Sequence, residues 1–266
     1  MTSNSIQNLY SEIIKQLKKS GDEDPEYVAI YIIEHVLDST YLNLLSKSHQ
    51  VSIEQKQDIL NCVNQYLNHI PLAYIFKSTY FRRNKYAIKP GVLIPRPETE
   101  QMVEYLIGII AKIKQTTPIT IFELGLGSGV ISIELAKQFN DTSFYGWDIS
   151  PIAIDVTKKN MLTMNIHNLT VIHDNFFSSI HNYLSKTGFN LIISNPPYVS
   201  IDEYNQLEPN VLMEPKEALV AEDNGLAIIH QCLEISYKHN LGFFSEIGFK
   251  HKSMLANRFS DLKFLN

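Results

Sequence analysis

The sequence has few cysteines and no pattern of residues that would hold a metal ion. Cys62 and Cys232 are the only two cysteines in 266 residues. This number excludes a disulfide framework and a four-cysteine zinc site. Both cysteines lie within apolar helical patterns, so we expect buried thiols in a reducing cytoplasm. The nine histidines show no ligand-type spacing, and no metal site is expected.

Long apolar runs and an excess of basic residues are also absent. No segment approaches the roughly 18 uncharged apolar residues that a membrane-spanning helix needs. Residues 1–9 are polar and lack the apolar core of a signal peptide. The net charge is −5, whereas proteins of duplex nucleic acid usually carry a basic excess. We therefore predict a cytoplasmic protein with no membrane partner and no direct nucleic-acid binding.

The first 75 residues have the pattern of a helical bundle. Apolar residues repeat at helical spacing from residue 6 to residue 17. Asp24 followed by Pro25 predicts the start of a second helix. Ser52 with Gln55 forms a capping box that opens a third. We predict an N-terminal helical domain over residues 1–76.

A short β segment follows. Residues 79–81 and 86–88 predict a hairpin around a polar tip, and residues 77–97 are expected to form a β-hairpin linker. Pro95 and Pro97 favour an extended turn over a helix. Helical periodicity resumes over residues 100–114. We assign residues 98–266 to a second domain.

Strands and helices alternate after Pro118. Strands are expected at 119–124, 143–147, 169–173, 191–194 and 242–247. Helices are expected at 130–138, 151–164, 225–239 and 250–259. This alternation predicts an α/β fold with a parallel sheet covered by helices on both faces.

A glycine-rich turn follows the first of these strands and opens a helix. Gly125, Gly127 and Gly129 have the spacing G-x-G-x-G, which is neither the dinucleotide fingerprint nor a phosphate loop. The turn has the position of the nucleotide-binding turn in a doubly wound sheet. Glu123 would repel phosphates but could hold an ammonium or hydroxyl group. Alternatively, the glycines only tighten the turn.

Acidic and amide side chains follow the next two strands. Asp148 lies about 20 residues after the turn, where an acid accepts hydrogen bonds from ribose hydroxyls. Asp148 could instead cap the following helix. Asp174 or Asn175 could accept from the exocyclic amine of adenine. An Asx-type turn is the alternative for this pair.

The segment after the fourth strand has the most specific chemistry. Asn195, Pro196, Pro197 and Tyr198 follow each other at a strand end that faces the ligand crevice of an open parallel sheet. The prolines remove two backbone donors and leave carbonyls free to accept. The Asn195 side-chain carbonyl and the Pro196 carbonyl could hold a planar NH2 group, and Tyr198 supplies a flat face. This set predicts chemistry on an amino nitrogen.

In this order the motifs resemble a class I S-adenosylmethionine-dependent methyltransferase of the amino-methylating group, with a Rossmann-like, mostly parallel sheet. Further segments are similar to the signatures of the HemK/PrmC family: residues 71–75, 94–100, 214–219 and 246–248. That family methylates the side-chain amide nitrogen of the glutamine in the Gly-Gly-Gln motif of peptide-chain release factors. The resemblance covers the chain from about residue 5 onward, and it implies release factors as partners and a monomeric enzyme.

The resemblance also implies site residues. The cofactor-binding set is Glu123, Gly125, Leu126, Gly127, Ser128, Gly129, Asp148, Asp174, Asn175 and Asn195. The catalytic set is Asn195, Pro196 and Tyr198, and the target glutamine is held by Asn195, Pro196, Pro197 and Tyr198. The family often has an acid directly before two bulky residues, and Asn175 occupies that place here, so either Asp174 or Asn175 could contact adenine. Arg96 is expected to order the turn between the domains. The N-terminal helical domain is expected to dock the release factor; alternatively, its helices only stabilise the enzyme.

Two other functions compete with this one. An amino-methyltransferase acting on adenine in DNA or RNA would use the same Asn195 to Tyr198 segment on a flipped-out base. A cofactor-binding module without catalysis is the third interpretation, and the intact Asn195 to Tyr198 segment argues against it.

The resemblance also bears on the C-terminal end of the sheet. Family members continue into an antiparallel pair of strands, and here the first strand of that pair would begin at residues 262–266. The resemblance therefore implies a truncated C-terminal sheet with an exposed edge on the fifth strand.

Overall fold

The computed structural model describes residues 5–259 and residue 263. The chain forms two compact units, Met1–Lys77 and Ser78–Asn266. The hairpin that the sequence suggested as a linker falls within the second unit.

The first unit consists of helices that end at recognisable caps. They are α1 (Ile6–Ser20), α2 (Pro25–Leu37), α3 (Tyr41–Ser46), α4 (Ile53–Leu67) and α5 (Leu72–Ile75). Asp24 caps α2, whose first residue is Pro25, and Ser52 and Gln55 form both bonds of the capping box of α4. Apolar faces of the helices meet in a core that the unit builds from its own residues. Helix α3 has only six residues, too few to show a periodicity in the sequence.

The hairpin consists of β1 (Ser78–Phe81) and β2 (Asn84–Ala87). Arg82 and Arg83 form its two-residue turn, and both have positive φ angles of 45° and 67°. Positive φ at both central positions is what a type I′ hairpin turn requires.

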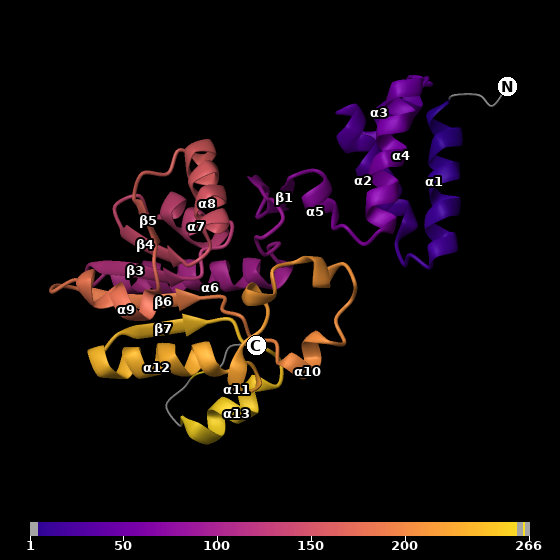
Figure 1. Cartoon of the computed structure of the whole chain (residues 1–266). Coiled ribbons are helices and arrows are strands. Elements are labelled where there is room, and N and C mark those ends of the chain that lie inside the picture. The colour runs from indigo at the N-terminus through magenta and orange to yellow at the C-terminus, as the bar shows by residue number, and fades with distance from the viewer. Residues whose placement is uncertain (1–4, 260–262, 264–266) are drawn as a thin grey trace. The chain divides into compact units, whose positions relative to one another are not determined.

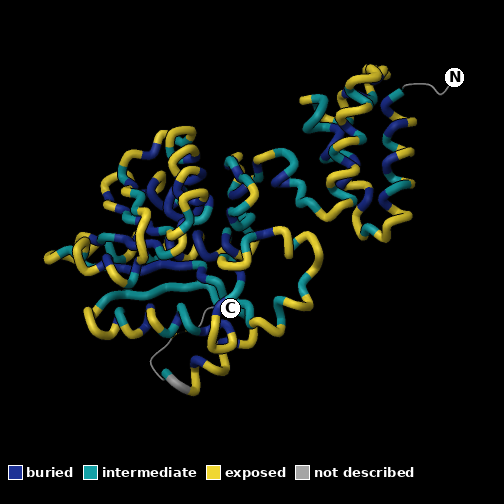
Figure 2. Tube along the Cα trace, in the orientation of Figure 1, coloured by how far each residue is buried: buried dark blue, intermediate teal, exposed yellow. Residues whose placement is uncertain are grey.

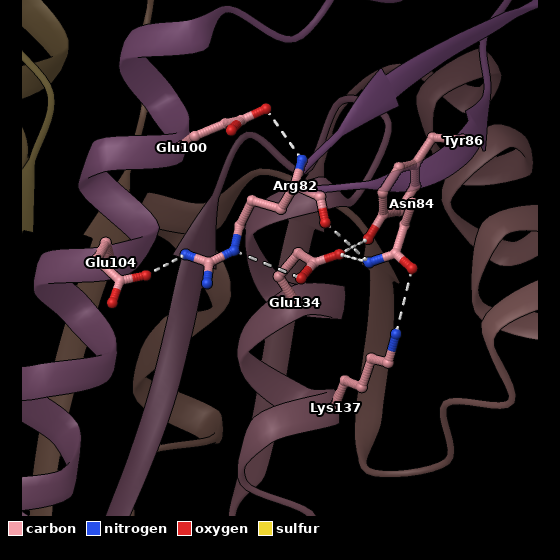
Figure 3. Close-up of polar contacts among 7 residues, drawn as sticks. All are labelled: Arg82, Asn84, Tyr86, Glu100, Glu104, Glu134 and Lys137. Atoms are coloured by element: carbon pink, nitrogen blue, oxygen red, sulfur yellow. Dashed lines mark hydrogen bonds and ion pairs between the residues drawn. The ribbon is translucent and has the colours of Figure 1, made fainter.

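A network of polar contacts fixes the hairpin to the rest of the second unit (Figure 3). Glu134 on helix α7 (Val130–Gln138) accepts hydrogen bonds from Asn84 and Tyr86. Arg82 makes ion pairs with Glu134 and with Glu104 of helix α6 (Pro97–Lys114). Tyr86 is fully buried. The hairpin is therefore part of the second unit's core rather than a free connection.

A five-stranded parallel sheet forms the centre of the second unit. Its strands are β3 (Ile119–Leu124), β4 (Ser143–Asp148), β5 (Leu169–His173), β6 (Phe189–Ser194) and β7 (Gly242–Ser245). They lie in the order β5-β4-β3-β6-β7, as Figure 1 shows. The strand order reverses between β3 and β6, which is the point where open α/β sheets bind their ligands.

Helices cover both faces of this sheet. Ile121 and Ile193 face a core built with α6, α7 and α8 (Pro151–Met164). Phe122 and Ile192, one residue along each strand, face α9 (Phe176–Ser179) and α12 (Ala227–His239). The inner strands are buried, and the outer helix surfaces are exposed (Figure 2). The predicted doubly wound fold is confirmed.

The remaining elements are short. They are α10 (Ile201–Tyr204), α11 (Glu222–Gly225), α13 (His251–Arg258) and three 3-10 helices over Ile180–Asn182, Val211–Met213 and Lys216–Ala218. Among the described residues, no helix has both the length and the apolar content for a membrane crossing.

Three sequence-based expectations need correction. Pro97 does not prevent a helix, because it is the first residue of α6, where the missing N–H costs nothing. Cys62 is only partly buried, since it lies on the side of α4 at the margin of the core, whereas Cys232 is buried as expected. Strand β7 ends at Ser245, two residues before the expected end. The strand expected to begin at residues 262–266 lies outside the described residues, apart from residue 263.

Candidate active site

The predicted site residues lie at the carboxyl ends of β3, β4, β5 and β6. Leu124, the last residue of β3, pairs with Ser194, the last residue of β6. The Ser194 hydroxyl donates to the Leu124 carbonyl at 2.9 Å. The glycine-rich turn after β3 and the Asn195 segment after β6 therefore leave the sheet side by side.

The glycine-rich turn folds back on β4. The N–H groups of Gly125 and Leu126 both donate to the Trp147 carbonyl. Leu126 is buried, and its side chain fills the space where Gly146 has no Cβ. The turn therefore presents backbone rather than a Leu126 side chain to a ligand.

Left-handed glycines shape the turn. Gly125, Gly127 and Gly129 have φ angles of 77°, 55° and 80°. A Cβ placed on Gly125 or Gly127 would meet no atom within 4 Å, so a ligand can approach the backbone there. At Gly129 the Cβ would lie 2.7 Å from the Thr157 side chain, so this glycine allows α7 and α8 to pack closely. Ser128 is buried, and its carbonyl accepts from Asn160.

Glu123 is a buried carboxyl group with one unused oxygen. Its exposed fraction is 1%. One oxygen, Oε2, accepts from the Ser132 N–H at 3.0 Å, whereas Oε1 has no hydrogen-bond partner among the described residues. Burial raises the pKa of Glu123 to about 8, against the opposing effect of the Ser132 hydrogen bonds. An unpaired buried carboxyl oxygen is a place for a cationic or hydroxyl group of a ligand.

Asp148 ends β4 and links two loops. Its Oδ2 accepts from the Gly127 N–H at 2.9 Å, and its Oδ1 accepts from the Ser150 N–H at 2.8 Å. Burial raises the pKa of this carboxyl group. Each carboxylate oxygen can accept a second hydrogen bond, so two ligand hydroxyls still have acceptors here. Ser150, rather than Asp148, caps the following helix.

The structure separates the roles of Asp174 and Asn175. Asn175 Oδ1 accepts from the N–H groups of Phe177 and Ser178 and caps α9. Asp174 is exposed, and its Oδ1 accepts only from the N–H of Asn175 among the contacts found in the described residues. The geometry thus leaves Asp174 with the freer acceptor.

Asn195 and Tyr198 are held by two residues outside the predicted site. The Asn195 Nδ2 group donates to Thr99 Oγ1 at 3.0 Å, and this hydroxyl donates to Glu246 Oε2 at 2.9 Å. Tyr198 donates its phenolic proton to Glu246 Oε1 at 3.0 Å. Burial raises the pKa values of Tyr198 and Glu246. Pro196 is buried and Pro197 half-buried.

Thr99 and Glu246 were not among the predicted site residues. Both belong to segments that the sequence had marked, residues 94–100 and 246–248. No spacing rule joins positions 147 residues apart, so only the fold could bring them together.

Arg96 joins two of the other marked segments. Its guanidinium forms an ion pair with the buried carboxylate of Glu214. The second oxygen of Glu214 accepts from the Ile94 N–H at 2.8 Å. Arg96 thus fixes the entry to α6 against residues 214–219.

Backbone strain lies next to Tyr198. Asp223, Asn224 and Gly225 all have positive φ angles, of 53°, 53° and 86°. A Cβ on Gly225 would lie 2.1 Å from the Tyr198 carbonyl oxygen. This glycine therefore permits the close approach that sets the path of the chain after Pro197.

The hydrogen-bond acceptors of the site fit one kind of ligand. Glu123 offers an unpaired oxygen suited to an ammonium group, Asp148 offers acceptors for hydroxyls, and open glycine backbone lies between them. A nucleoside that carries a cationic amino-acid end matches all three.

Comparisons with known proteins agree with this fit. The model of the methyltransferase small domain matches residues 107–242, and that of the PrmC N-terminal domain matches residues 8–76. The release factor glutamine methyltransferase of Buchnera aphidicola subsp. Schizaphis graminum is 31% identical over 94% of this chain and 90% of that protein. That of Fusobacterium nucleatum is 30% identical over 97% of this chain and 73% of that protein.

Longer relatives match as well. The bifunctional methyltransferase of Rickettsia typhi is 32% identical over 96% of this chain. The chain spans about half the length of that relative. Both domain models, the 30–31% identity to full-length relatives and the doubly wound sheet lead to one family. The chain belongs to the HemK/PrmC family of class I S-adenosylmethionine-dependent methyltransferases.

Proposed function

We propose that the protein transfers a methyl group from S-adenosylmethionine to the side-chain amide nitrogen of the glutamine in the Gly-Gly-Gln motif of release factors. The observation that carries this proposal is the anchored Asn195, whose amide is held from one side by Thr99. The names of the relatives support the release factor as substrate. Under this proposal the enzyme acts as a monomer in the cytoplasm, where translation ends.

The residues that would hold the cofactor surround the glycine-rich turn. The unpaired Glu123 oxygen would hold its amino group, the Asp148 carboxylate would accept from its ribose hydroxyls, and the Asp174 carboxylate would accept from its adenine amine; the free acceptors on these residues support this assignment. When bound, S-adenosylmethionine supplies a methyl group on an electron-poor sulfonium. The backbone of the turn from Gly125 to Gly129 lines the methionine and ribose parts.

The target amide is a poor nucleophile, so its placement is the main contribution of the protein. The Asn195 side-chain carbonyl and the Pro196 carbonyl accept the two N–H bonds of the glutamine NH2 group. Held in this way, the nitrogen presents its face to the methyl donor. The same two acceptors stabilise the positive charge that develops on nitrogen. The nitrogen that has accepted the methyl group carries a positive charge and is strongly acidic, so it loses its extra proton to solvent without a strong base.

The N-terminal unit has a separate proposed role. We assign residues 1–76 to docking of the release factor and residues 98–266 to catalysis, with the hairpin segment 77–97 between them. The self-contained helical core supports a module with its own binding task.

The test of this function is mass spectrometry of a release factor after incubation with the protein and S-adenosylmethionine. A mass gain of one methyl group on the Gly-Gly-Gln peptide is expected. The same assay on adenine-containing DNA and RNA tests the nucleic-acid alternative, which the names of the relatives do not favour. Methylation of nucleic acid without methylation of the release factor would overturn the proposal.

Asn195→Ala tests the role of the anchored amide. We expect turnover on a release factor to fall by about 100-fold or more, the scale of a lost orienting group, and cofactor affinity to fall far less. Turnover is measured by methyl incorporation, and affinity by calorimetry. Near-wild-type turnover in this variant would contradict the orienting role proposed for Asn195.

A further inference from the structure

One carboxylate holds both ends of the Asn195 to Tyr198 segment. Glu246 Oε2 accepts from Thr99, and Glu246 Oε1 accepts from Tyr198. Thr99 is 2% exposed, and Glu246 is partly buried, so these contacts are shielded from competing water. The three segments that meet here come from α6, from the end of β6 and from the residues after β7.

The direction of each hydrogen bond follows from the number of protons. An ionised carboxylate has no proton to donate, so Thr99 must donate to Glu246. The Thr99 hydroxyl has a single proton, and it is used in that bond. Its oxygen can then only accept, which requires the NH2 end of the Asn195 amide to face it. Among the described residues, no hydrogen bond engages Asn195 Oδ1.

We propose that Thr99 and Glu246 are positioning residues, which lock the Asn195 amide with Oδ1 directed at the substrate nitrogen through a one-way chain of hydrogen bonds from the Glu246 carboxylate. This inference rests on the proposed methyl transfer. A flipped amide would present NH2 to the target NH2 group, so two donors would face each other and the acceptor would be lost. The chain of hydrogen bonds selects the productive one of two amide orientations that have nearly the same shape.

Protonation of Glu246 would reverse the direction of these hydrogen bonds. A protonated Oε2 donates to Thr99, Thr99 then donates to Asn195, and the amide turns its Oδ1 toward Thr99. The groups that face Glu246 act in both directions: burial and the charge of Glu98 raise its pKa, while Arg96 and the hydrogen bonds from Thr99 and Tyr198 lower it. The advantage conferred by Thr99 is therefore expected to shrink as the pH falls.

Thr99→Val tests the series of hydrogen bonds from Glu246 through Thr99 to Asn195, because the valine side chain has nearly the same shape as threonine and cannot form a hydrogen bond. We expect kcat on a release factor to fall by roughly 10- to 100-fold, the scale of a misoriented group. Cofactor affinity, measured by calorimetry, should be unchanged. Thr99→Ser keeps the hydroxyl and should restore most of the turnover. The matched control is Thr142→Val, another buried threonine, which accepts from Lys114 just before β4 begins, at the opposite end of the sheet.

A double-mutant cycle separates positioning from general damage. In the Asn195→Ala background, measured in single turnover with enzyme in excess, Thr99→Val should cost nothing further, because no amide is left to orient. The ratio of wild-type to Thr99→Val turnover should also fall at acidic pH. Any one of four results would overturn the proposal. Two are wild-type turnover in Thr99→Val and failure of Thr99→Ser to restore turnover. The others are a pH-independent ratio of wild-type to Thr99→Val turnover and an equal loss of turnover from Thr99→Val in the Asn195→Ala background.

A readout without turnover keeps this test independent of the proposed substrate. The side-chain NH2 resonances of Asn195 are identified by NMR as the pair that disappears in Asn195→Asp. They should shift in Thr99→Val and stay in place in Thr99→Ser and Thr142→Val. If the wild type fails to methylate a release factor while these resonances behave as expected, the substrate assignment fails and the hydrogen-bond chain stands. Unshifted resonances in Thr99→Val overturn the chain itself.

Discussion

If Glu123 holds the amino group of the cofactor, as proposed, cofactor binding should depend on pH. Burial raises its pKa to about 8, so the carboxyl group is mostly protonated in the free protein at neutral pH. An ammonium group binds the carboxylate form, so binding must release a proton. Below pH 8, affinity for S-adenosylmethionine should therefore rise with pH, by at most about tenfold per pH unit. The Glu123→Gln variant should lose this dependence.

Calorimetry at pH 7 in two buffers of different ionisation enthalpy counts the released proton. The Glu104→Gln variant, which changes an exposed carboxyl group, should release as many protons as the wild type. Equal proton release by Glu123→Gln and wild type would contradict the role of Glu123. The raised pKa also has a consequence for folding: the carboxyl group weakens the folded state as pH rises from about 4.5 to about 8, because only the unfolded chain ionises freely there.

Two glycines on the same unit should respond oppositely to alanine. A Cβ on Gly225 would overlap the Tyr198 carbonyl oxygen, and its φ of 86° disfavours any side chain. Gly225→Ala should lower the free energy of unfolding by about 2 kcal/mol and reduce turnover, since Tyr198 must move. Gly108→Ala places its Cβ in open space on helix α6 and should stabilise the protein by about 0.5–1 kcal/mol. Thermal denaturation of both variants checks the contrast; a stable, active Gly225→Ala would contradict it.

Single residues were predictable only as far as local chemistry defines them. Asp148 and Asn195 are polar residues at the ends of strands, and this local information was enough to predict where they lie. Leu126 shows what local chemistry misses, because its side chain is buried against Gly146, a contact set by the neighbouring strand. Glu246 lies in a segment that resembles a family signature, but the sequence did not predict its role, because that role depends on a contact with Thr99 that only the fold creates.

At the scale of elements, the hairpin depends on its buried tyrosine. Tyr86 is fully buried and donates to Glu134, which also accepts from Asn84. Tyr86→Phe removes one of these bonds to a buried acceptor and should cost about 1 kcal/mol of unfolding free energy. Tyr80→Phe changes an exposed ring on the same hairpin and should cost nothing measurable. Denaturant titrations compare the two, and an equal effect would show that the network in Figure 3 adds no stability.

Element boundaries followed the sequence where a capping residue or an apolar strand defines them. The helices 130–138 and 151–164 and the strands 119–124 and 169–173 lie as expected. The start of α6 was misjudged, because two prolines suggested a turn although the second one occupies the first helical position. The short helix Ile201–Tyr204 has too few residues for a periodicity, and only the capping box of Ser200 and Glu203 marks its start in the sequence.

At the scale of the whole molecule, deletion of residues 1–77 tests the docking role. If the N-terminal unit docks the release factor, the remaining chain should methylate a short Gly-Gly-Gln peptide as before and lose most activity on the full release factor. Unchanged activity on the full release factor would reject docking. Equal losses on both substrates would point to damage of the catalytic unit, which circular dichroism of the truncated chain checks independently.

The strand order also sets a sequence of events during synthesis. Strand β3 is made early and lies at the centre of the sheet, and its partner β6 follows about 70 residues later, as the bond between Ser194 and Leu124 illustrates. Contacts of this separation form slowly, whereas the helices of the first unit meet through nearby contacts. We therefore expect a nascent chain that still holds Asn195 inside the ribosome to carry folded N-terminal helices, while the glycine-rich turn lacks its neighbour until β6 pairs with β3.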